Sequence, residues 1–228
     1  MARGPTRKGD GGRMLATRVR SARGRSNAST RWLQRQLNDP YVAKAQAAGY
    51  RSRAAFKLVE LDDRFGLIKP ASLIVDLGAA PGGWTQVAAE RAPKGRIVGV
   101  DIQSIDPIPG AELLELDIYS DDAIRRIQAA LGAERADVVL SDMAPSTTGH
   151  KRTDQLRIAG LADAAYDVAR QMLAADGAFA VKVFQGGAPP ELLAMLKRDF
   201  ANVRHAKPPA SRSDSAEMYL VASGFRGD

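Results

Sequence analysis

Short apolar runs alternate with longer amphipathic stretches through most of the chain. Each run has the length of a buried strand, and each intervening stretch is long enough for a helix. The runs occupy positions 73–77, 97–100, 113–116, 138–140 and 179–184. This alternation is typical of βαβ units, which build a parallel sheet with helices on both faces. The pattern therefore predicts an α/β protein with a Rossmann-like, doubly wound fold.

Two further segments near the end of the chain, at 202–207 and 218–222, predict two more strands. The segment between them contains Pro208, Pro209 and several serines, and it is too short for a crossover helix. Parallel neighbours need a connection of about a dozen residues or more, so the last strand should run antiparallel. We expect a seven-stranded, mostly parallel sheet with an antiparallel last strand.

A helix is predicted over 53–65, ahead of the first strand. Its apolar positions have roughly helical spacing and are Phe56, Val59, Leu61 and Phe65. Ser52 directly precedes this stretch, and its hydroxyl can cap the first turn. Lys57 lies on the same helix beside Phe56.

The segment before Trp32 is strongly basic. Against the single acid Asp10 it carries Arg3, Arg7, Lys8, Arg13, Arg18, Arg20, Arg23, Arg25 and Arg31. We predict a disordered basic arm over 1–28, which has almost nothing apolar to bury, and one globular domain over 29–228. The arm could contact nucleic-acid phosphates, remain a solvated tail, or serve as a mitochondrial transit peptide, and the sequence leaves these alternatives open.

Composition narrows the range of functions. The formal net charge of +7 suits a polyanionic partner, for which nucleic acid is the leading candidate. No apolar run approaches the ~18 residues of a spanning helix, so we expect no membrane partner. The chain has no cysteine and only two histidines, His150 and His205, which excludes thiolate catalysis and argues against a metal site. At 228 residues, one core and a monomer are the default expectation.

Ionisable residues recur at equivalent places in successive strand units. They are Asp76, Asp101, Asp117 and Asp142 at the ends of the first four strands and Lys182 near the end of the fifth. Any one of these aspartates could simply cap a helix or form a turn. Because ligands of open α/β sheets bind outside the carboxyl ends of the strands, we expect the five to converge on one crevice.

The turn after the first strand, residues 76–85, is rich in glycine and leads into a helix. Small residues let the backbone approach a ligand, and the N–H groups that begin a helix favour a carboxylate. Gly78, Gly82 and Gly83 do not have the Gly-x-Gly-x-x-Gly spacing, which counts against a nicotinamide cofactor. Asp101 can accept from a ribose diol and Asp117 from an adenine amino group. A nucleoside-containing cofactor without phosphates fits this set.

Lys182 interrupts an otherwise apolar strand. It could be an edge lysine whose charge reaches solvent, but a functional lysine is favoured. Burial and a nearby Lys57 would disfavour its charged form, which suits a general base, whereas Asp142 and Glu217 would favour the charged form. The sequence therefore leaves open whether Lys182 accepts a proton or only positions a hydroxyl. Glu217, directly before the last strand, can pair with Lys57.

Several motifs occur together in this chain. They are the residues at 29–33, 52–58, 76–85, 141–145, 181–186 and 211–219. With them the chain resembles the FtsJ/RlmE family of RNA 2′-O-ribose methyltransferases from about 29 to 224. The resemblance implies the S-adenosylmethionine-dependent methyltransferase version of the fold, with 29–228 as the methyltransferase domain. It assigns catalysis to Lys57, Asp142, Lys182 and Glu217, and binding of S-adenosyl-L-methionine to Gly82, Trp84, Asp101, Asp117 and Asp142.

The same resemblance implies methylation of a uridine 2′-hydroxyl in 23S ribosomal RNA, on the large ribosomal subunit and in the bacterial cytoplasm. Lys182 would be the general base, and Asp142 would orient it. One alternative is a non-catalytic RNA-binding factor for ribosome assembly. Another is a methyltransferase acting on another RNA, on small molecules or on base nitrogens. The stretch Asp142-Met143-Ala144-Pro145 lacks the Asn/Asp-Pro-Pro-aromatic motif usual for base amino methylation.

Overall fold

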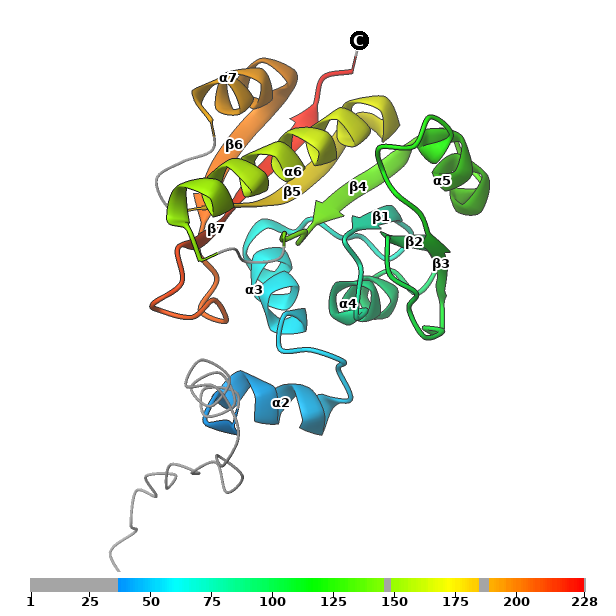
Figure 1. The fold of residues 1–228 in the computed structure, drawn as a ribbon. Coiled ribbons are helices and arrows are strands. Elements are labelled where there is room, and N and C mark those ends of the chain that lie inside the picture. Colours follow the sequence, from blue (N-terminus) through cyan, green and yellow to red (C-terminus); the bar gives the residue numbers. More distant parts are fainter. Residues whose placement is uncertain (1–36, 146–148, 185–188, 228) are drawn as a thin grey trace, which may run out of the picture.

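A seven-stranded sheet forms the centre of the computed structural model, which describes residues 37–145, 149–184 and 189–227 (Figure 1). The strand order is β3-β2-β1-β4-β5-β7-β6. The strands are β1 (Leu73–Leu77), β2 (Arg96–Asp101), β3 (Ala111–Glu115), β4 (Ala136–Ser141), β5 (Leu173–Phe184), β6 (Phe200–Ala206) and β7 (Glu217–Phe225). β7 runs antiparallel to both β5 and β6, while the pairs from β3 to β5 are parallel. The predicted sheet, including its antiparallel last strand, is confirmed.

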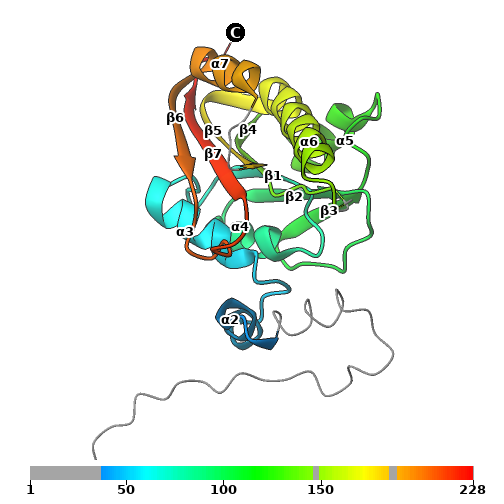
Figure 2. The same cartoon turned by 60° about the vertical axis from the view of Figure 1, so that its left-hand side comes forward.

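Helices cover both faces of the sheet. They are α2 (Pro40–Ala48), α3 (Ala55–Phe65), α4 (Gly83–Arg91), α5 (Ala123–Leu131), α6 (Lys151–Met172) and α7 (Pro190–Asp199). α3 and α4 pack on one face and α5, α6 and α7 on the other (Figures 1 and 2). Neighbouring residues of β1 serve opposite faces: Ile74 packs with α3 and α4, whereas Val75 packs with α5 and α6. This is the two-residue period of a strand buried on both sides.

α2 lies apart from the sheet, beyond α3, in both views (Figures 1 and 2). Tyr41 donates a hydrogen bond to Glu60 of α3 at 2.8 Å. Asp39, which caps α2, forms an ion pair with Arg53 at 2.8 Å. The predicted basic arm over 1–28 lies outside the described residues.

The helix predicted over 53–65 begins later, at Ala55, and the expectation that Ser52 caps it is wrong. The helix has no side-chain cap, because residues 52–55 form a turn in which the Ala55 amide donates to the Ser52 carbonyl. The Ser52 hydroxyl is buried instead, and a Cβ added at Gly83 would lie 2.5 Å from it. Close packing between this turn and α4 therefore took precedence over the local capping preference.

The order of the strands reverses between β1 and β4, and ligands of doubly wound sheets bind at such a point. Asp76 lies within β1, Asp101 ends β2, Asp142 follows β4 and Lys182 lies in β5. Within the described ranges, no helix is long and apolar enough to cross a membrane. In the same ranges, no three His, Asp or Glu side chains form a group that could hold a metal ion.

Candidate active site

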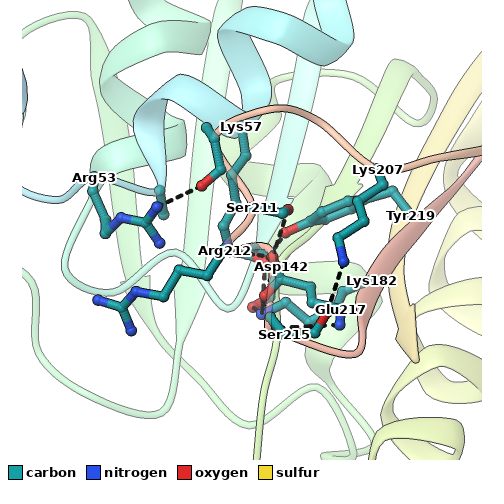
Figure 3. A network of polar contacts seen from close by, with 12 residues as sticks. Arg53, Lys57, Asp142, Lys182, Lys207, Ser211, Arg212, Ser215, Glu217 and Tyr219 are labelled. Carbon is teal, nitrogen blue, oxygen red and sulfur yellow. Dashed lines mark hydrogen bonds and ion pairs between the residues drawn. The ribbon is translucent and has the colours of Figure 1, made fainter. Parts of the chain in front are cut away.

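Four charged side chains, from α3, β5, β7 and the segment that follows β4, meet beside the carboxyl end of β4 (Figure 3). Lys182 Nζ lies 2.7 Å from Asp142 Oδ1, and Lys57 Nζ lies 2.7 Å from Glu217 Oε1. Two longer contacts join these pairs: Lys57 Nζ lies 3.6 Å from Asp142 Oδ2, and Lys182 Nζ lies 3.7 Å from Glu217 Oε2. The structure thus brings together all four residues that the sequence assigned to catalysis.

Sheet register explains how β5 and β7 deliver two of these side chains. Lys182 is the register partner of Tyr219, and Phe184 is the partner of Glu217. Glu217 therefore lies diagonally from Lys182 across an antiparallel pair, a separation that long side chains span. Lys57 reaches the cluster from α3, where it is one of the buried residues.

The cluster is largely withdrawn from solvent, since Lys57 and Lys182 are each only 7% exposed. Burial alone would raise the pKa of Asp142, but the nearby charges of Lys182 and Lys57 outweigh it and hold that pKa below its ordinary value. A hydrogen bond from the Tyr219 hydroxyl acts in the same direction. Asp142 is therefore a carboxylate that accepts from several donors.

Lys182 donates twice to the same residue. Its Nζ lies 2.7 Å from the Asp142 carboxylate and 2.7 Å from the Asp142 backbone oxygen. An ammonium group has three N–H donors, so these contacts leave one N–H for a third acceptor. In this geometry the lysine can hold an incoming hydroxyl beside the carboxylate.

A polar pocket of about 320 Å³ adjoins the cluster on its outer side. Its lining is Arg53, Lys57, Arg212, Asp214, Ser215 and Glu217. Asp39 holds both arginines in place, with contacts of 2.8 Å to Arg53 and 3.2 Å to Arg212. The pocket offers a cationic wall next to Lys57 and Glu217.

The glycine-rich turn lies between β1 and α4, at the same end of the sheet. Gly82 has φ +113°, and a Cβ there would lie 2.5 Å from Ile108 Cδ1. Arg51 braces this turn, donating to the carbonyls of Pro81 at 3.2 Å, Asp106 at 2.7 Å and Pro107 at 2.8 Å. The backbone at Gly82 is thus fixed in a conformation that a side chain would strain.

The remaining aspartates differ in what they can bind. Asp101 accepts from the amides of Ala80 and Gln103, both at 2.9 Å, and each of its oxygens keeps a second lone pair. Asp117 lies two residues beyond the end of β3 and is exposed. Adjacent strands therefore present two carboxylates at the same end of the sheet, an arrangement that fits the hydroxyl and amino groups of a nucleoside.

Two side chains lie deeper than the sequence suggested. Trp84 is 3% exposed and its indole donates to the Ala54 carbonyl at 2.8 Å, so the ring lies in the core and not in the crevice. Asp76 is fully buried and accepts from the Thr85 hydroxyl at 2.6 Å. It stabilises the first turn of α4 through this hydrogen bond and does not line the crevice.

Tyr219, Arg51 and Ser211 contribute to the site, although the sequence assigned none of them an individual role and marked Ser211 and Tyr219 only as the ends of the motif at 211–219. The Tyr219 hydroxyl donates to Asp142 Oδ1 at 2.6 Å, and the Ser211 hydroxyl donates to Glu217 at 3.0 Å. A two-residue strand period would have placed Tyr219 on the same face as Glu217. No local signal gives the partners of Arg51 or Ser211, because the partners of Arg51 are distant in the chain and the contact of Ser211 depends on a loop.

The fold and the site together define a methyltransferase of the doubly wound α/β class. The chain belongs to the FtsJ-like methyltransferase family, whose model matches residues 50–225.

Relatives named ribosomal RNA large subunit methyltransferase E match nearly the whole chain. The Paramagnetospirillum magneticum protein named ribosomal RNA large subunit methyltransferase E is 57% identical, and the match covers 95% of this chain and 91% of that one. A protein of the same name from Acidiphilium cryptum is 57% identical, with 95% of each chain covered. A crystal structure described as a ribosomal RNA methyltransferase from Plasmodium falciparum is 33% identical. It covers 78% of this chain and all of that chain, with a TM-score of 0.71.

Proposed function

We propose that the protein transfers the methyl group of S-adenosylmethionine to the 2′-hydroxyl of a uridine in the 23S RNA of the large ribosomal subunit. The observation that carries the proposal is the buried cluster of Lys57, Asp142, Lys182 and Glu217, in which Lys182 and Asp142 are 2.7 Å apart. A hydroxyl is a weak acid, so it needs a partner for its proton and a firm orientation, and this cluster can provide both.

The glycine-rich turn and its neighbours suit the cofactor. Backbone N–H groups at the start of α4 would receive its carboxylate, Asp101 its ribose diol and Asp117 its adenine amino group. Gly82 would allow the close backbone approach. When bound, S-adenosylmethionine supplies an electrophilic methyl group.

The chain's own residues would orient and deprotonate the acceptor. Asp142 and Lys182 hold the 2′-hydroxyl, and Lys182, once it has released one proton to solvent and become a neutral amine, receives the hydroxyl proton as the oxygen attacks. Lys57 and Glu217 complete the network and keep Asp142 and Lys182 in place. Correct positioning of two reactants can lower a barrier by ~7–11 kcal/mol, so orientation would account for much of the rate.

An RNA acceptor agrees with the charge of the chain, which is +7. The pocket beside the cluster has Arg53 and Arg212 in its wall, and cationic walls suit phosphates. The relatives above carry the name ribosomal RNA large subunit methyltransferase E, which supports the large subunit as the source of that RNA. They are bacterial, which favours the cytoplasm over a mitochondrial location. We also propose that the protein acts as a monomer, without a metal ion and without a membrane partner.

The test is transfer of labelled methyl from S-adenosylmethionine to large ribosomal subunits that lack this modification, with free 23S RNA compared in parallel. Lys182→Ala should lower the rate by about 100-fold or more, the size of a general-base contribution. Lys94→Ala, at an exposed lysine before β2, is the matched control and should act like the native protein. Nucleoside mass spectrometry would locate the methyl group.

Label on one uridine ribose, abolished only by Lys182→Ala, would support the proposal. Label on a base would overturn the assignment of the site. Cofactor binding without transfer to subunits or free RNA would overturn the reaction and favour the non-catalytic assembly factor.

A further inference from the structure

Tyr219 lies at the centre of the proposed site although it reaches no solvent. It is 0% exposed, and in the sheet it is the register partner of Lys182. Glu217 precedes it by two positions, so both side chains lie on the same face of β7. Strand geometry thus directs the phenol ring beneath the charged cluster.

The hydroxyl of Tyr219 shares one carboxylate oxygen with Lys182. It donates to Asp142 Oδ1 at 2.6 Å, and Lys182 Nζ lies 2.7 Å from the same atom (Figure 3). The second oxygen, Oδ2, faces Lys57 at 3.6 Å. The phenol therefore helps to determine which Asp142 oxygen faces each lysine.

The ring of Tyr219 makes two further contacts. Its centroid lies 5.6 Å from that of Trp84, in the first turn of α4, at an interplanar angle of 33°. Lys57 Nζ lies 5.8 Å from the same ring, within the range of a cation–π contact. One side chain thus contacts the helix that follows the cofactor turn, one lysine of the cluster, and the carboxylate.

The phenol stays a neutral donor throughout the pH range of an RNA enzyme. Burial, and then the negative charge of Asp142, raise the pKa of Tyr219 well above 10. Its hydrogen bond in turn helps to hold the pKa of Asp142 low, beside the larger effects of Lys182 and Lys57. The contact is therefore a permanent charge-assisted hydrogen bond.

We propose that Tyr219 is a positioning residue for methyl transfer, which fixes the Asp142 carboxylate for Lys182 and links that carboxylate to the cofactor turn through Trp84. The inference rests on the function proposed above. Tyr219 acts through Asp142 and does not touch the reacting atoms. A tyrosine with only a structural role would affect stability, but not turnover, when its hydroxyl is removed.

Tyr219→Phe is the direct test, because phenylalanine keeps the ring and removes only the hydroxyl. The turnover number should fall on the order of 10-fold or more, as for loss of a hydrogen bond to a charged group. The affinity for S-adenosylmethionine, measured by calorimetry, should change little. The acid limb of the pH–rate profile should move to higher pH, because an Asp142 carboxylate without the phenol donor pairs more strongly with the proton that Lys182 must release before it can act as the base.

Tyr166→Phe is the matched control. Tyr166 is also buried, at 1% exposed, and its hydroxyl donates to the carboxylate of Asp199, but it packs against Phe179 on the other face of the sheet. Both variants should lose some thermal stability, whereas only Tyr219→Phe should change turnover and the pH profile. Rates are to be divided by the concentration of cofactor-binding sites, so that any unfolded fraction drops out.

Three outcomes overturn the inference. A Tyr219→Phe protein with native turnover and pH profile would show that the hydroxyl has no positioning role. A loss equal to that of Tyr166→Phe would assign the tyrosine to stability alone. Absence of transfer by the native protein in the same assay would overturn the proposed function, and the role of Tyr219 with it.

Discussion

At the scale of single residues, the site depends on which partners contact each of the two carboxylate oxygens of Asp142. One oxygen accepts from Tyr219 and Lys182, and the other faces Lys57. Each lysine also lies within 4 Å of Glu217, at 2.7 Å for Lys57 and 3.7 Å for Lys182. Two positive and two negative groups thus balance in a space where a single buried charge would be costly.

Replacing Lys182 with arginine distinguishes proton transfer from simple positioning. Arginine keeps the positive charge but cannot give up a proton in a protein. If Lys182 accepts the hydroxyl proton, Lys182→Arg should lose about 100-fold or more in turnover, much like Lys182→Ala. Single-turnover kinetics at saturating cofactor would measure this. Near-native turnover with arginine would mean that Lys182 only positions the hydroxyl.

Asp76 gives a prediction about stability and pH. Its pKa is raised to about 7, mainly by burial and further by the negative charges of Asp142 and Asp101. The hydrogen bond from Thr85 acts in the opposite direction. Because the folded-state pKa is the higher one, the unfolded chain releases this proton first as pH rises. The contribution of the protonated Asp76 to the free energy of unfolding is fully present below pH ~4, and it is lost as the pH rises to ~7.

Asp76→Asn should therefore stabilise the protein more at pH 8 than at pH 5, relative to the native chain, because asparagine has no proton to release. Denaturant unfolding at the two pH values would measure the difference in the free energy of unfolding. Asp121→Asn, at an exposed position, is the control and should show no such pH-dependent gain. Equal effects of Asp76→Asn at both pH values would contradict a raised pKa.

At the scale of elements, the carboxyl ends of parallel strands place residues from separate units around one crevice. β1 leads into the glycine-rich turn, β2 ends at Asp101 and β4 leads to Asp142. The antiparallel β7 then brings Glu217 and Tyr219 back to the same end of the sheet. A parallel β7 would begin at the opposite end of the sheet, and Glu217 would then lie far from Lys57.

Gly82→Ala should weaken cofactor binding by about 10-fold or more. Its φ of +113° disfavours any side chain, and a Cβ would lie 2.5 Å from Ile108 Cδ1 and 3.0 Å from Arg51 Nη1. Backbone strain of this kind costs about 1–3 kcal/mol, and relief would move the turn. Calorimetric titration with S-adenosylmethionine would measure the change.

Gly160→Ala in α6 is the control for Gly82→Ala, because a Cβ there meets nothing within 4 Å. Removing a helical glycine should stabilise the protein by about 1 kcal/mol and leave cofactor affinity unchanged. Native affinity in Gly82→Ala would show that the turn tolerates a side chain and does not approach the cofactor closely.

At the scale of the whole molecule, the distribution of charge governs how RNA is approached. The basic residues of 1–28 lie outside the described residues, but their sequence predicts attraction to phosphates. We expect this arm to add affinity that does not depend on the base sequence, while the crevice selects the nucleotide. Long-range attraction and local selection would then come from different parts of the chain.

Replacing Arg18, Arg20, Arg23 and Arg25 with serine should weaken ribosomal RNA binding and reduce its dependence on salt. For every phosphate that the arm no longer neutralises, the slope of log K against log salt should become shallower by ~0.7–0.9. Filter binding over a range of salt concentrations would measure the slope, with Arg125→Ser on α5 as the control. An unchanged slope would mean that the arm is a solvated tail.

The sequence by itself determined the sheet, the antiparallel last strand and the identity of the four charged residues. Strand and helix periods are local, and the short connection before the last strand rules out a parallel return. The resemblance to the family then assigned roles to Lys57, Asp142, Lys182 and Glu217, and the structure brings these four together. Their assignment to catalysis remains a prediction.

Only the tertiary structure decided which groups are buried and which atoms meet. It placed the Trp84 indole in the core, buried Asp76 beneath α4 and put the Tyr219 hydroxyl on Asp142. It also left α3 without the cap expected from Ser52. These outcomes depend on packing between segments far apart in the chain, where close contact overrides local preference. A pattern of residue types carries the period of an element, but not the neighbours that each side chain meets.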